Sequence, residues 1–242
     1  MDQEQKTTPL HSWHRNANAN MADFGGYDMP LWYETGVKEE HLAVLNSVGI
    51  FDTSHMACIT IDGDGAFTLL NHCFTRNLQS LAQGRCVYGA FLNHQGHCID
   101  DAIVYKLSDT RFMACVNSGM GAKLASHLKG HGADLEVVVK DLTGKVAKVD
   151  IQGMNSARVL AQVINTPEAV FTHMPYFSFK GHFNPEDSGS SMVTLRDSTP
   201  ILLSRSGYTG EFGFELFIDP SAVESLWTTI LDSGQPYGLK SC

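Results

Sequence analysis

The spacing of apolar and polar residues divides the chain into short helices and short strands. Between residues 37 and 49, Val37, His41, Leu42 and Leu45 recur at helical spacing. Gly49 follows at a place where glycine often ends a helix. From residue 57 the pattern becomes a two-residue alternation in ACITIDG, CVYGAFLN, CIDDAIVYKL and RFMACVN. This alternation predicts strands joined by tight turns, as in an antiparallel sheet.

Helical segments interrupt the predicted strands at residues 65–74, 119–130, 155–164 and 221–231. Ser118 can cap the second of these helices and Gly130 can end it. Asp219 followed by Pro220 is a strong start for the last one. After residue 142 the order strand, helix, strand, strand resumes, as if the sequence restarts. We therefore predict an α+β fold in two lobes, with mainly antiparallel sheets and packed helices.

Composition narrows the classes of protein. The 242 residues carry a net charge of −9 with no cluster of Lys and Arg among aromatics, so we expect no nucleic-acid partner. No apolar run reaches the roughly 18 residues of a membrane helix, and the polar N-terminus lacks a signal-peptide core. We expect no membrane association, a cytoplasmic location and a flexible tail over residues 1–8. The six cysteines contain no C-x-x-C pair, which argues against a disulfide framework. The polar stretch 184–199 is expected to be an exposed excursion.

Asp100 and Asp101 lie side by side within the apolar strand segment IDDAIVYKL. The two-residue period of a strand puts Asp101 on one face with Ile99 and Ile103, and Asp100 on the other. A carboxylate between two isoleucines would be desolvated, which raises its pKa and lets it exchange a proton near neutral pH. The alternative is that one aspartate bonds a backbone amide or a hydroxyl at a bulge or a strand edge.

The segment SRSGYTGEFGFEL, residues 204–216, is rich in glycine. A G-x-G-x-x-G nucleotide loop must be followed by a helix, whereas GFELFID continues as a strand that contains Glu215. Either this turn brings the backbone close to a ligand, or it is a wide hairpin turn with a solvated Glu211.

Other candidates are weaker. His94, His97 and Cys98 lie near the aspartates, but NHQG is a turn signature and no second ligand cluster has recognisable spacing, so we expect no metal. His55 and several aromatic residues either line a pocket or fill the core. These aromatic residues are Phe24, Tyr27, Trp32 and Tyr33.

Eight motifs follow one another between Pro9 and Gly238: FGGYDMPLWY, GVKEEH, GIFDTSHM, GHCIDDAIVY, VNSG, DIQG, MPYFSF and SRSGYTGEFGFEL. Each is weak alone, but the ordered set is specific. In this order and at this spacing they resemble the aminomethyltransferase family, the folate-dependent T-protein of the glycine cleavage system and its relatives. The chain departs from the family pattern at His97 and Cys98, since relatives usually have two glycines before the aspartates.

The resemblance implies roles for nine residues. Asp101 matches the family's second aspartate and would be the catalytic residue beside the folate nitrogens. Glu215 matches the glutamate that holds the polar edge of the pterin. The other positions that would line the tetrahydrofolate pocket are Met56, Tyr88, Tyr105, Cys115, Asn117, Tyr176 and Phe177.

The resemblance also implies a reaction and a domain plan. A one-carbon unit would pass from the aminomethyl-lipoyl arm of the H-protein to tetrahydrofolate, with release of ammonia. Two alternatives stay open: a folate-dependent demethylase of another small methyl donor, and a folate-binding regulatory or assembly protein without turnover. Residues 9–52 with 142–242 would form a discontinuous first domain and residues 53–141 a second. The family's C-terminal β-barrel domain is absent from these residues.

Overall fold

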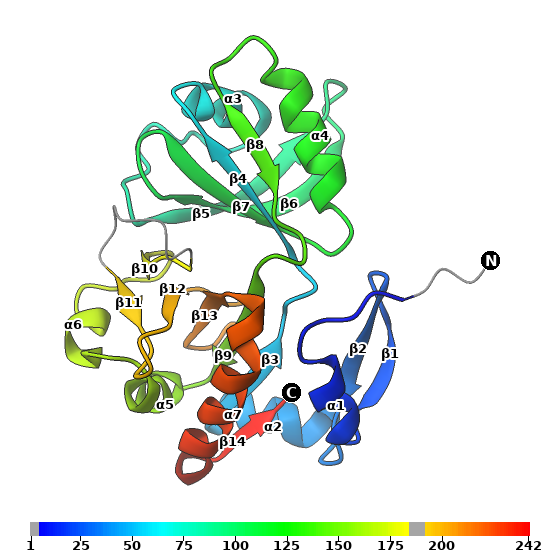
Figure 1. Ribbon diagram of the computed structural model, residues 1–242, viewed down its shortest axis with the longest axis vertical. Coiled ribbons are helices and arrows are strands. Elements are labelled where there is room, and N and C mark those ends of the chain that lie inside the picture. The colour runs from blue at the N-terminus through cyan, green and yellow to red at the C-terminus, as the bar shows by residue number, and fades with distance from the viewer. Residues whose placement is uncertain (1–4, 184–191) are drawn as a thin grey trace. The chain divides into compact units, whose positions relative to one another are not determined.

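The computed structural model describes residues 5–183 and 192–242 (Figure 1). Residues 1–4 of the predicted tail and 184–191 of the predicted excursion lie outside the described residues. The prediction of a flexible tail is wrong for residues 5–8. Lys6 forms a β-bridge with Tyr27, and the buried Thr8 hydroxyl donates to Asp52 Oδ2 at 2.6 Å. The excursion prediction is wrong for Val193 and Leu195, which are buried in a hydrophobic core.

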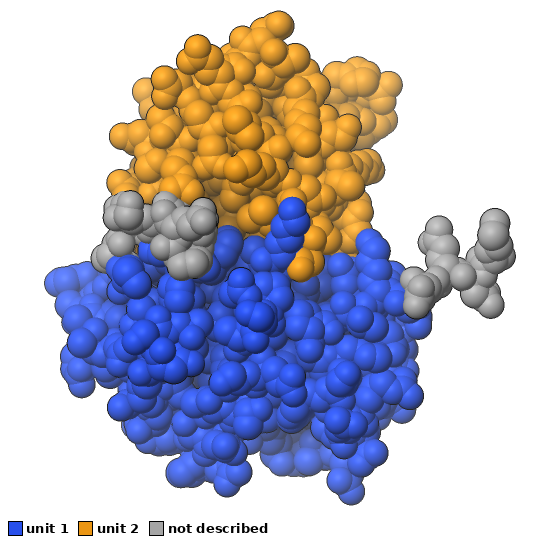
Figure 2. Space-filling model, viewed as in Figure 1, with its two compact units in different colours: residues 1–55, 145–176, 180–242 blue, residues 56–144, 177–179 orange. Residues whose placement is uncertain are grey.

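The chain forms two compact units, shown in two colours in Figure 2. Unit 1 consists of residues 1–55, 145–176 and 180–242, and unit 2 consists of residues 56–144 and 177–179. All six cysteines are free thiols. Within the described part of the chain, no helix combines the length and the apolar character needed to cross a bilayer.

Unit 1 is built on a sheet of seven strands over the described residues, in the order β10-β12-β13-β9-β3-β14, with β11 paired to β12. The β14 strand runs parallel to β3, whereas β3, β9, β13 and β12 pair antiparallel. The strands are β3 (Val48–Asp52), β9 (Ala147–Gln152), β10 (Phe179–Gly181), β11 (Val193–Thr194), β12 (Pro200–Ser204), β13 (Gly213–Ile218) and β14 (Leu239–Ser241).

A two-stranded hairpin and several helices complete unit 1. The hairpin is β1 (Asn20–Phe24) with β2 (Tyr27–Trp32). The α-helices are α1 (His11–Asn16), α2 (Val37–Asn46), α5 (Ser156–Val163), α6 (Pro167–Phe171) and α7 (Val223–Gly234), and the 3₁₀ turns are η1 (Pro220–Ala222) and η2 (Gln235–Tyr237). As predicted, Asp219 caps the last helical segment, accepting the Ser221 backbone N–H at 2.8 Å.

The core of unit 1 follows from the two-residue period of β9 and β13. Alternate side chains of both strands point into the apolar cluster that α5 and α7 cover, with Trp227 of α7 fully buried. The remaining side chains, which include Lys148, Asp150 and Glu215, face the other way and are buried too. Pairing sets Glu215 directly opposite Asp150. This sheet therefore places charged groups in a buried layer.

Unit 2 is a five-stranded sheet over its described residues, in the order β5-β6-β7-β4-β8. Its elements are β4 (Ala57–Asp62), α3 (Ala66–Cys73), β5 (Cys86–Leu92), β6 (Cys98–Lys106), β7 (Arg111–Val116), α4 (Gly121–His131) and β8 (Val138–Asp141). Apolar residues of α3 and α4 pack on one sheet face, against Ala102, Val104 and Phe112 among others. The antiparallel α+β prediction is confirmed.

Two predicted helix ends are wrong. The α2 helix stops at Asn46, and Gly49 lies inside β3, where an added Cβ would lie 2.7 Å from Val44. Gly130 lies within α4, which ends at His131 and has Gly132 as its C-cap. In both cases tertiary packing, which the local sequence does not carry, decides where the helix ends.

Candidate functional site

Asp101 is held in place by donors from both neighbouring strands. Its Oδ2 accepts the Tyr88 hydroxyl of β5 at 2.8 Å. Its Oδ1 accepts Nδ2 of Asn117, the residue after β7, at 2.7 Å. Because each carboxylate oxygen accepts one bond, the group is oriented while second lone pairs stay available to a ligand.

Asp100 has the structural role that was the alternative for one of the two aspartates. Its Oδ2 accepts the Asn117 backbone N–H and its Oδ1 accepts Asn117 Nδ2, both at 2.9 Å. The register of β5 and β6 shifts at this point, between Phe91 and Leu92. This irregularity is a β-bulge, which re-aims nearby side chains. Asn117 therefore bridges the two adjacent carboxylates.

The expected burial of Asp101 between two isoleucines is wrong. The face of β6 that packs against α3 and α4 is the face of Ala102 and Val104, whereas Asp101 and Ile103 are only half-buried. The strand period was assigned correctly, but an apolar sequence on both faces does not tell which face the helices cover. Asp101 is accordingly a hydrogen-bonded group within reach of solvent.

Four of the predicted folate residues share this sheet face of unit 2. Tyr88, half exposed, lies opposite Ile103, and Cys115 also pairs with Ile103, so both point to the side of Asp101. Tyr105 is on the same face and is fully buried, with its ring 5.3 Å from that of Phe179. The structure thus brings Tyr88, Asp101, Tyr105 and Cys115 onto one surface.

Two further predicted residues of unit 2 flank its strands. Met56 is half-buried just before β4. Phe177 accepts the Cys86 backbone N–H at 3.1 Å and has a φ of 58°. That left-handed conformation costs a bulky residue about 1–3 kcal/mol, and such strain clusters at functional positions.

Glu215 of unit 1 belongs to a buried ionic cluster. Its Oε1 lies 2.7 Å from Nζ of Lys148, which also lies 2.6 Å from Asp150 Oδ1. The Ser206 hydroxyl bonds Glu215 Oε2, and the Thr53 hydroxyl donates to Asp150 Oδ1 at 2.9 Å. The cluster contains two carboxyl groups and one ammonium, so full ionisation would leave an unbalanced buried charge.

The charge imbalance affects Asp150. Burial, the largest cause, raises the pKa of Asp150 to about 6; the Lys148 ammonium opposes the rise and the Glu215 carboxylate adds to it. Asp150 can therefore gain or lose a proton close to neutral pH, which is the property that the sequence argument had assigned to Asp101.

Sequence reasoning missed Lys148 and Asp150, although a signal was present. In AKVDIQ, residues 147–152, Lys148, Asp150 and Gln152 alternate with apolar residues, as on a strand with a polar face. The entire strand is buried, and burying polar side chains is costly unless they are paired. The polar face of this strand therefore indicates a functional or structural role.

Tyr176, the last predicted folate residue of unit 1, is about half exposed. The Arg205 guanidinium lies 5.7 Å from its ring centroid and 3.9 Å from that of Phe212. Arg205 Nη1 donates to the Gly213 carbonyl at 3.1 Å, which fixes this cation among the aromatic rings. Arg205 was also not singled out from the sequence.

The glycines of residues 204–216 make room for a protein side chain. An added Cβ on Gly207 or Gly213 would lie 2.2 or 2.1 Å from Oε1 of Gln152. The Gln152 amide in turn donates to the carbonyls of Ser206 and Phe214, both at 3.2 Å. The close approach that the glycines predicted is therefore to Gln152, and Glu211 is exposed as in the hairpin alternative.

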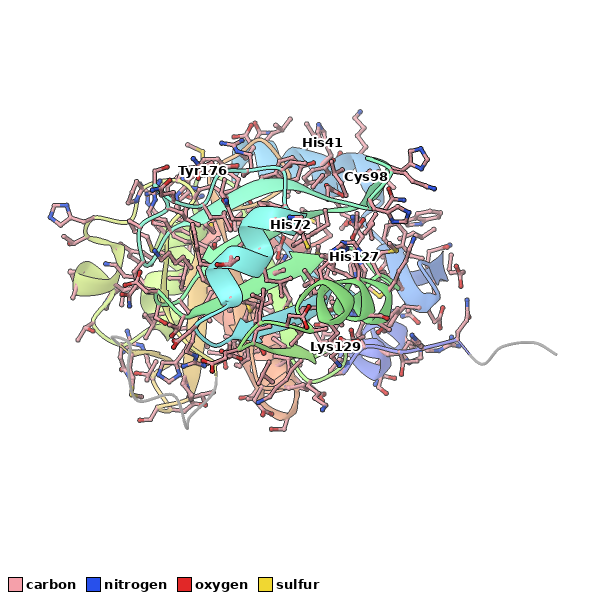
Figure 3. All side chains as sticks on the ribbon, turned by 90° about the horizontal axis from the view of Figure 1, so that it is seen from above. His41, His72, Cys98, His127, Lys129 and Tyr176 are labelled. Atoms are coloured by element: carbon pink, nitrogen blue, oxygen red, sulfur yellow. The ribbon has the colours of Figure 1, made fainter. Side chains whose placement is uncertain are left out.

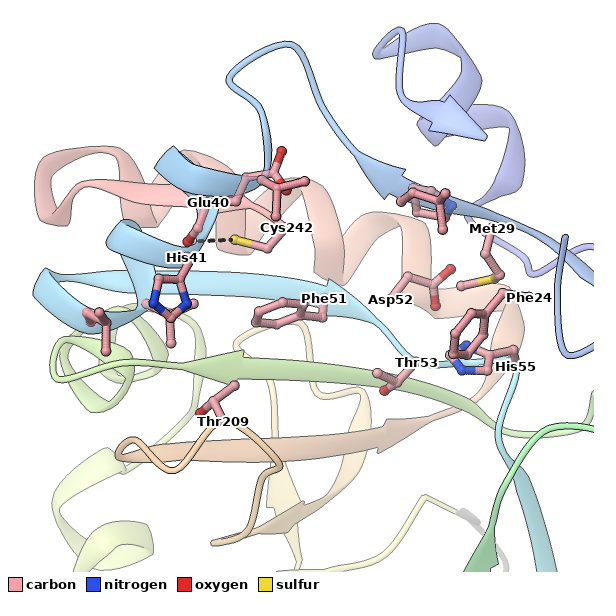
Figure 4. A pocket seen from close by; sticks show the side chains of 15 residues that line it. Phe24, Met29, Glu40, His41, Phe51, Asp52, Thr53, His55, Thr209 and Cys242 are labelled. Atoms are coloured by element: carbon pink, nitrogen blue, oxygen red, sulfur yellow. Dashed lines mark hydrogen bonds between the residues drawn. The ribbon is translucent and has the colours of Figure 1, made fainter. Parts of the chain in front are cut away.

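A separate cavity of about 500 Å³ lies within unit 1 (Figure 4). Phe24 and His55 line it, as the pocket interpretation of the aromatic segment suggested, whereas Tyr27 and Tyr33 are buried in the core. Its acidic groups are bonded within the protein; Glu40, for example, accepts the Tyr33 backbone N–H at 2.6 Å. None of the nine predicted folate residues lines this cavity, so it carries no argument for catalysis.

Comparison with known proteins agrees with the motifs. Residues 10–242 match the family model described as the GCVT N-terminal domain. Aminomethyltransferases of Streptomyces avermitilis and Chloroherpeton thalassium are each 34% identical to this chain over 97% of its length. The crystal structure of the glycine cleavage system aminomethyltransferase T from Bartonella henselae superimposes with a TM-score of 0.83, at 28% identity, over 98% of the chain.

These matches cover only part of the relatives. The chain spans 59% of the Streptomyces protein, 60% of the Chloroherpeton protein and 59% of the Bartonella chain. The family match, in contrast, takes in nearly all of the present sequence and all of the site residues described above. The chain therefore belongs to the GCVT N-terminal domain family of aminomethyltransferases.

Proposed function

We propose that this chain is the folate-handling part of a tetrahydrofolate-dependent aminomethyltransferase of the glycine cleavage T-protein type. The single observation that carries the proposal is the Asp101 carboxylate, half-buried and oriented by the Tyr88 hydroxyl and the Asn117 amide. The one-carbon donor would be the aminomethyl group on the lipoyl arm of the H-protein. Family membership and the name of the Bartonella henselae relative support this choice of reaction.

Tetrahydrofolate, when bound, would supply the nitrogen that receives the one-carbon unit. Asp101 would hold or accept the proton exchanged beside that nitrogen. Tyr88 and Asn117 would keep the carboxylate aimed, and Asp100 would keep Asn117 in place through its two bonds. Such a preset geometry lowers the entropic part of the barrier.

The donor set of Glu215 fits an aminopyrimidine edge. Its two oxygens accept from Lys148 and Ser206, and an ionised carboxylate, which only accepts hydrogen bonds, suits the N–H groups of an aminopyrimidine. We propose that Glu215 accepts the N–H groups of the pterin. Lys148 would stabilise the carboxylate, and Asp150 would take up a proton when the charge of the cluster changes.

Anaerobic calorimetric titration with tetrahydrofolate tests the binding role. We expect micromolar affinity for the 242-residue chain and a loss of tenfold or more, about 1.4 kcal/mol, in Glu215→Gln. Glu211→Gln, in the same glycine-rich segment but exposed, is the matched control and should bind as wild type does. Equal affinity in all three proteins would contradict the role of Glu215.

Activity with H-protein carrying the aminomethyl group tests the catalytic role. We expect ammonia release that depends on tetrahydrofolate and is lost in Asp101→Asn, while that variant still binds folate. Turnover that needs no H-protein but consumes another methyl donor would identify a demethylase instead. Folate binding without turnover on any methyl donor would identify a binding protein.

A further inference from the structure

Three side chains with metal-binding chemistry lie together on helices α3 and α4 of unit 2. One ligand atom each of Cys73, His127 and His131 lies within 4.8 Å of the other two. His127 and His131 are one turn apart on α4, so they project from the same face of that helix. Cys73 is the last residue of α3, which packs against α4. Figure 3 looks onto these helices and labels His127.

The ring of His127 has the hydrogen bonding of a metal ligand. Its Nε2 is buried and has no hydrogen-bond partner within residues 5–183 and 192–242, which is rare for a buried polar atom. The ring also bonds the backbone of Leu92. Because Nε2 is unpartnered, Nδ1 is the ring nitrogen that faces the Leu92 backbone. Metal-ligating histidines almost always hold their second nitrogen in this way.

Zinc binds cysteine as the thiolate, so the Cys73 proton would leave to solvent as the ion binds.

We propose that Cys73, His127 and His131 bind one zinc ion, with water as the fourth ligand. One thiolate sulfur and two imidazole nitrogens are donors that zinc prefers, in a tetrahedral arrangement. His131 is exposed, so the fourth position faces solvent. The ligands come from two helices that are far apart in the sequence, so a bound ion would tie α3 to α4. This site is distinct from Asp101 and uses none of the residues assigned to folate.

Cobalt(II) is the probe for this site, because a cobalt–thiolate bond gives a sulfur-to-metal charge-transfer band in the near ultraviolet. The reduced full chain should bind one cobalt ion with this band and with the intense visible bands of tetrahedral cobalt, and zinc should displace it. Cys73→Ser should abolish the charge-transfer band. Cys98→Ser, an exposed cysteine of β6, is the matched control and should keep it.

Zinc affinity gives a second, independent measurement. His127→Gln should lower it by more than about 100-fold, since loss of an outer-shell partner alone costs about 10–100-fold. His131→Gln changes only an exposed side chain, cannot disturb the core, and should also lose at least tenfold. Zinc should raise the melting temperature of wild type more than that of His131→Gln. A band that survives Cys73→Ser or vanishes in Cys98→Ser, or equal zinc affinity in His131→Gln, would overturn the proposal.

Discussion

Replacing Lys148 with methionine tests whether the buried cluster of unit 1 depends on its ammonium group. The side chain is 3% exposed, and Nζ lies 2.6 Å from Asp150 and 2.7 Å from Glu215. Methionine preserves the length and the apolar stem of lysine but not its charge. Both carboxyl groups then lose the cation that balances them, in surroundings that water does not reach.

The cost follows from the protons that the cluster must take up. Without Lys148 the folded state needs one more protonated carboxyl than wild type does. Protonating a carboxyl whose pKa in the unfolded chain is about 4 costs about 4 kcal/mol at pH 7 and about 1.4 kcal/mol at pH 5. The reason is that each pH unit above the pKa adds about 1.4 kcal/mol. The first figure agrees with the 3–5 kcal/mol typical of breaking a buried ion pair.

The sign of the pH dependence is set by the direction of these shifts. The folded variant has carboxyl pKa values raised above those of the unfolded chain, so between the two values it binds more protons than the unfolded chain does. Its deficit relative to wild type should therefore shrink as the pH falls from 7 to 5.

Urea unfolding followed by tryptophan fluorescence measures the effect. All three tryptophans, Trp13, Trp32 and Trp227, belong to unit 1, so the signal reports the unit that contains Lys148. Lys145→Met, an exposed lysine just before β9, is the control and should change stability by no more than about 0.5 kcal/mol. A Lys148→Met deficit below about 1 kcal/mol at pH 7, or one equal at pH 5 and pH 7, would refute the ionic argument.

Three further changes test other contacts. Asp52→Asn should lower the free energy of unfolding by about 3 kcal/mol at pH 7. Burial of Asp52 raises its pKa, but hydrogen bonds from His14 and other donors outweigh burial, so the pKa is lowered. The loss should therefore diminish as acid protonates wild-type Asp52, which urea titrations at several pH values would show. Gly213→Ala should lower the free energy of unfolding by about 1–3 kcal/mol, because the added Cβ would clash with Gln152. Adding Gln152→Ser should restore part of that stability, as measured by thermal unfolding. Gly130 lies inside α4, and a Cβ added there would meet no atom within 4 Å. Gly130→Ala should therefore stabilise the protein by about 0.5–1 kcal/mol in thermal unfolding followed by circular dichroism. A loss of stability would mean that this glycine is needed for packing.

Much of the fold was readable because local patterns and tertiary structure agree. The alternation in ACITIDG and RFMACVN became β4 and β7, and the Asp219–Pro220 start became the capped turn before α7. The pairing of strands brought Tyr88 and Asn117 to Asp101, which strand period alone had singled out. The roles proposed for these residues in folate binding still rest on the family resemblance.

The misses share one physical cause. Whether Asp101 is buried depends on which sheet face α3 and α4 cover, and that is a long-range choice. Lys148 and Glu215 are 67 positions apart and meet only because β9 pairs with β13. Cys73 meets His127 only because two helices pack together. Spacing in one sequence can relate two residues on the same element, such as His127 and His131, but it does not show the partner that a second element supplies.

Unit 1 is assembled from three separate chain segments, and this affects how the protein folds during translation. The β3 strand is complete at Asp52, yet its antiparallel neighbour β9 begins only at Ala147, after all but three residues of unit 2 have been synthesised. At about 5–20 residues per second, the nascent β3 waits roughly 5–20 s for that neighbour. During this interval both of its hydrogen-bonding edges are bare, in a segment that will become an apolar interior. Translation speed and chaperone access over residues 53–146 should thus govern the yield of folded protein.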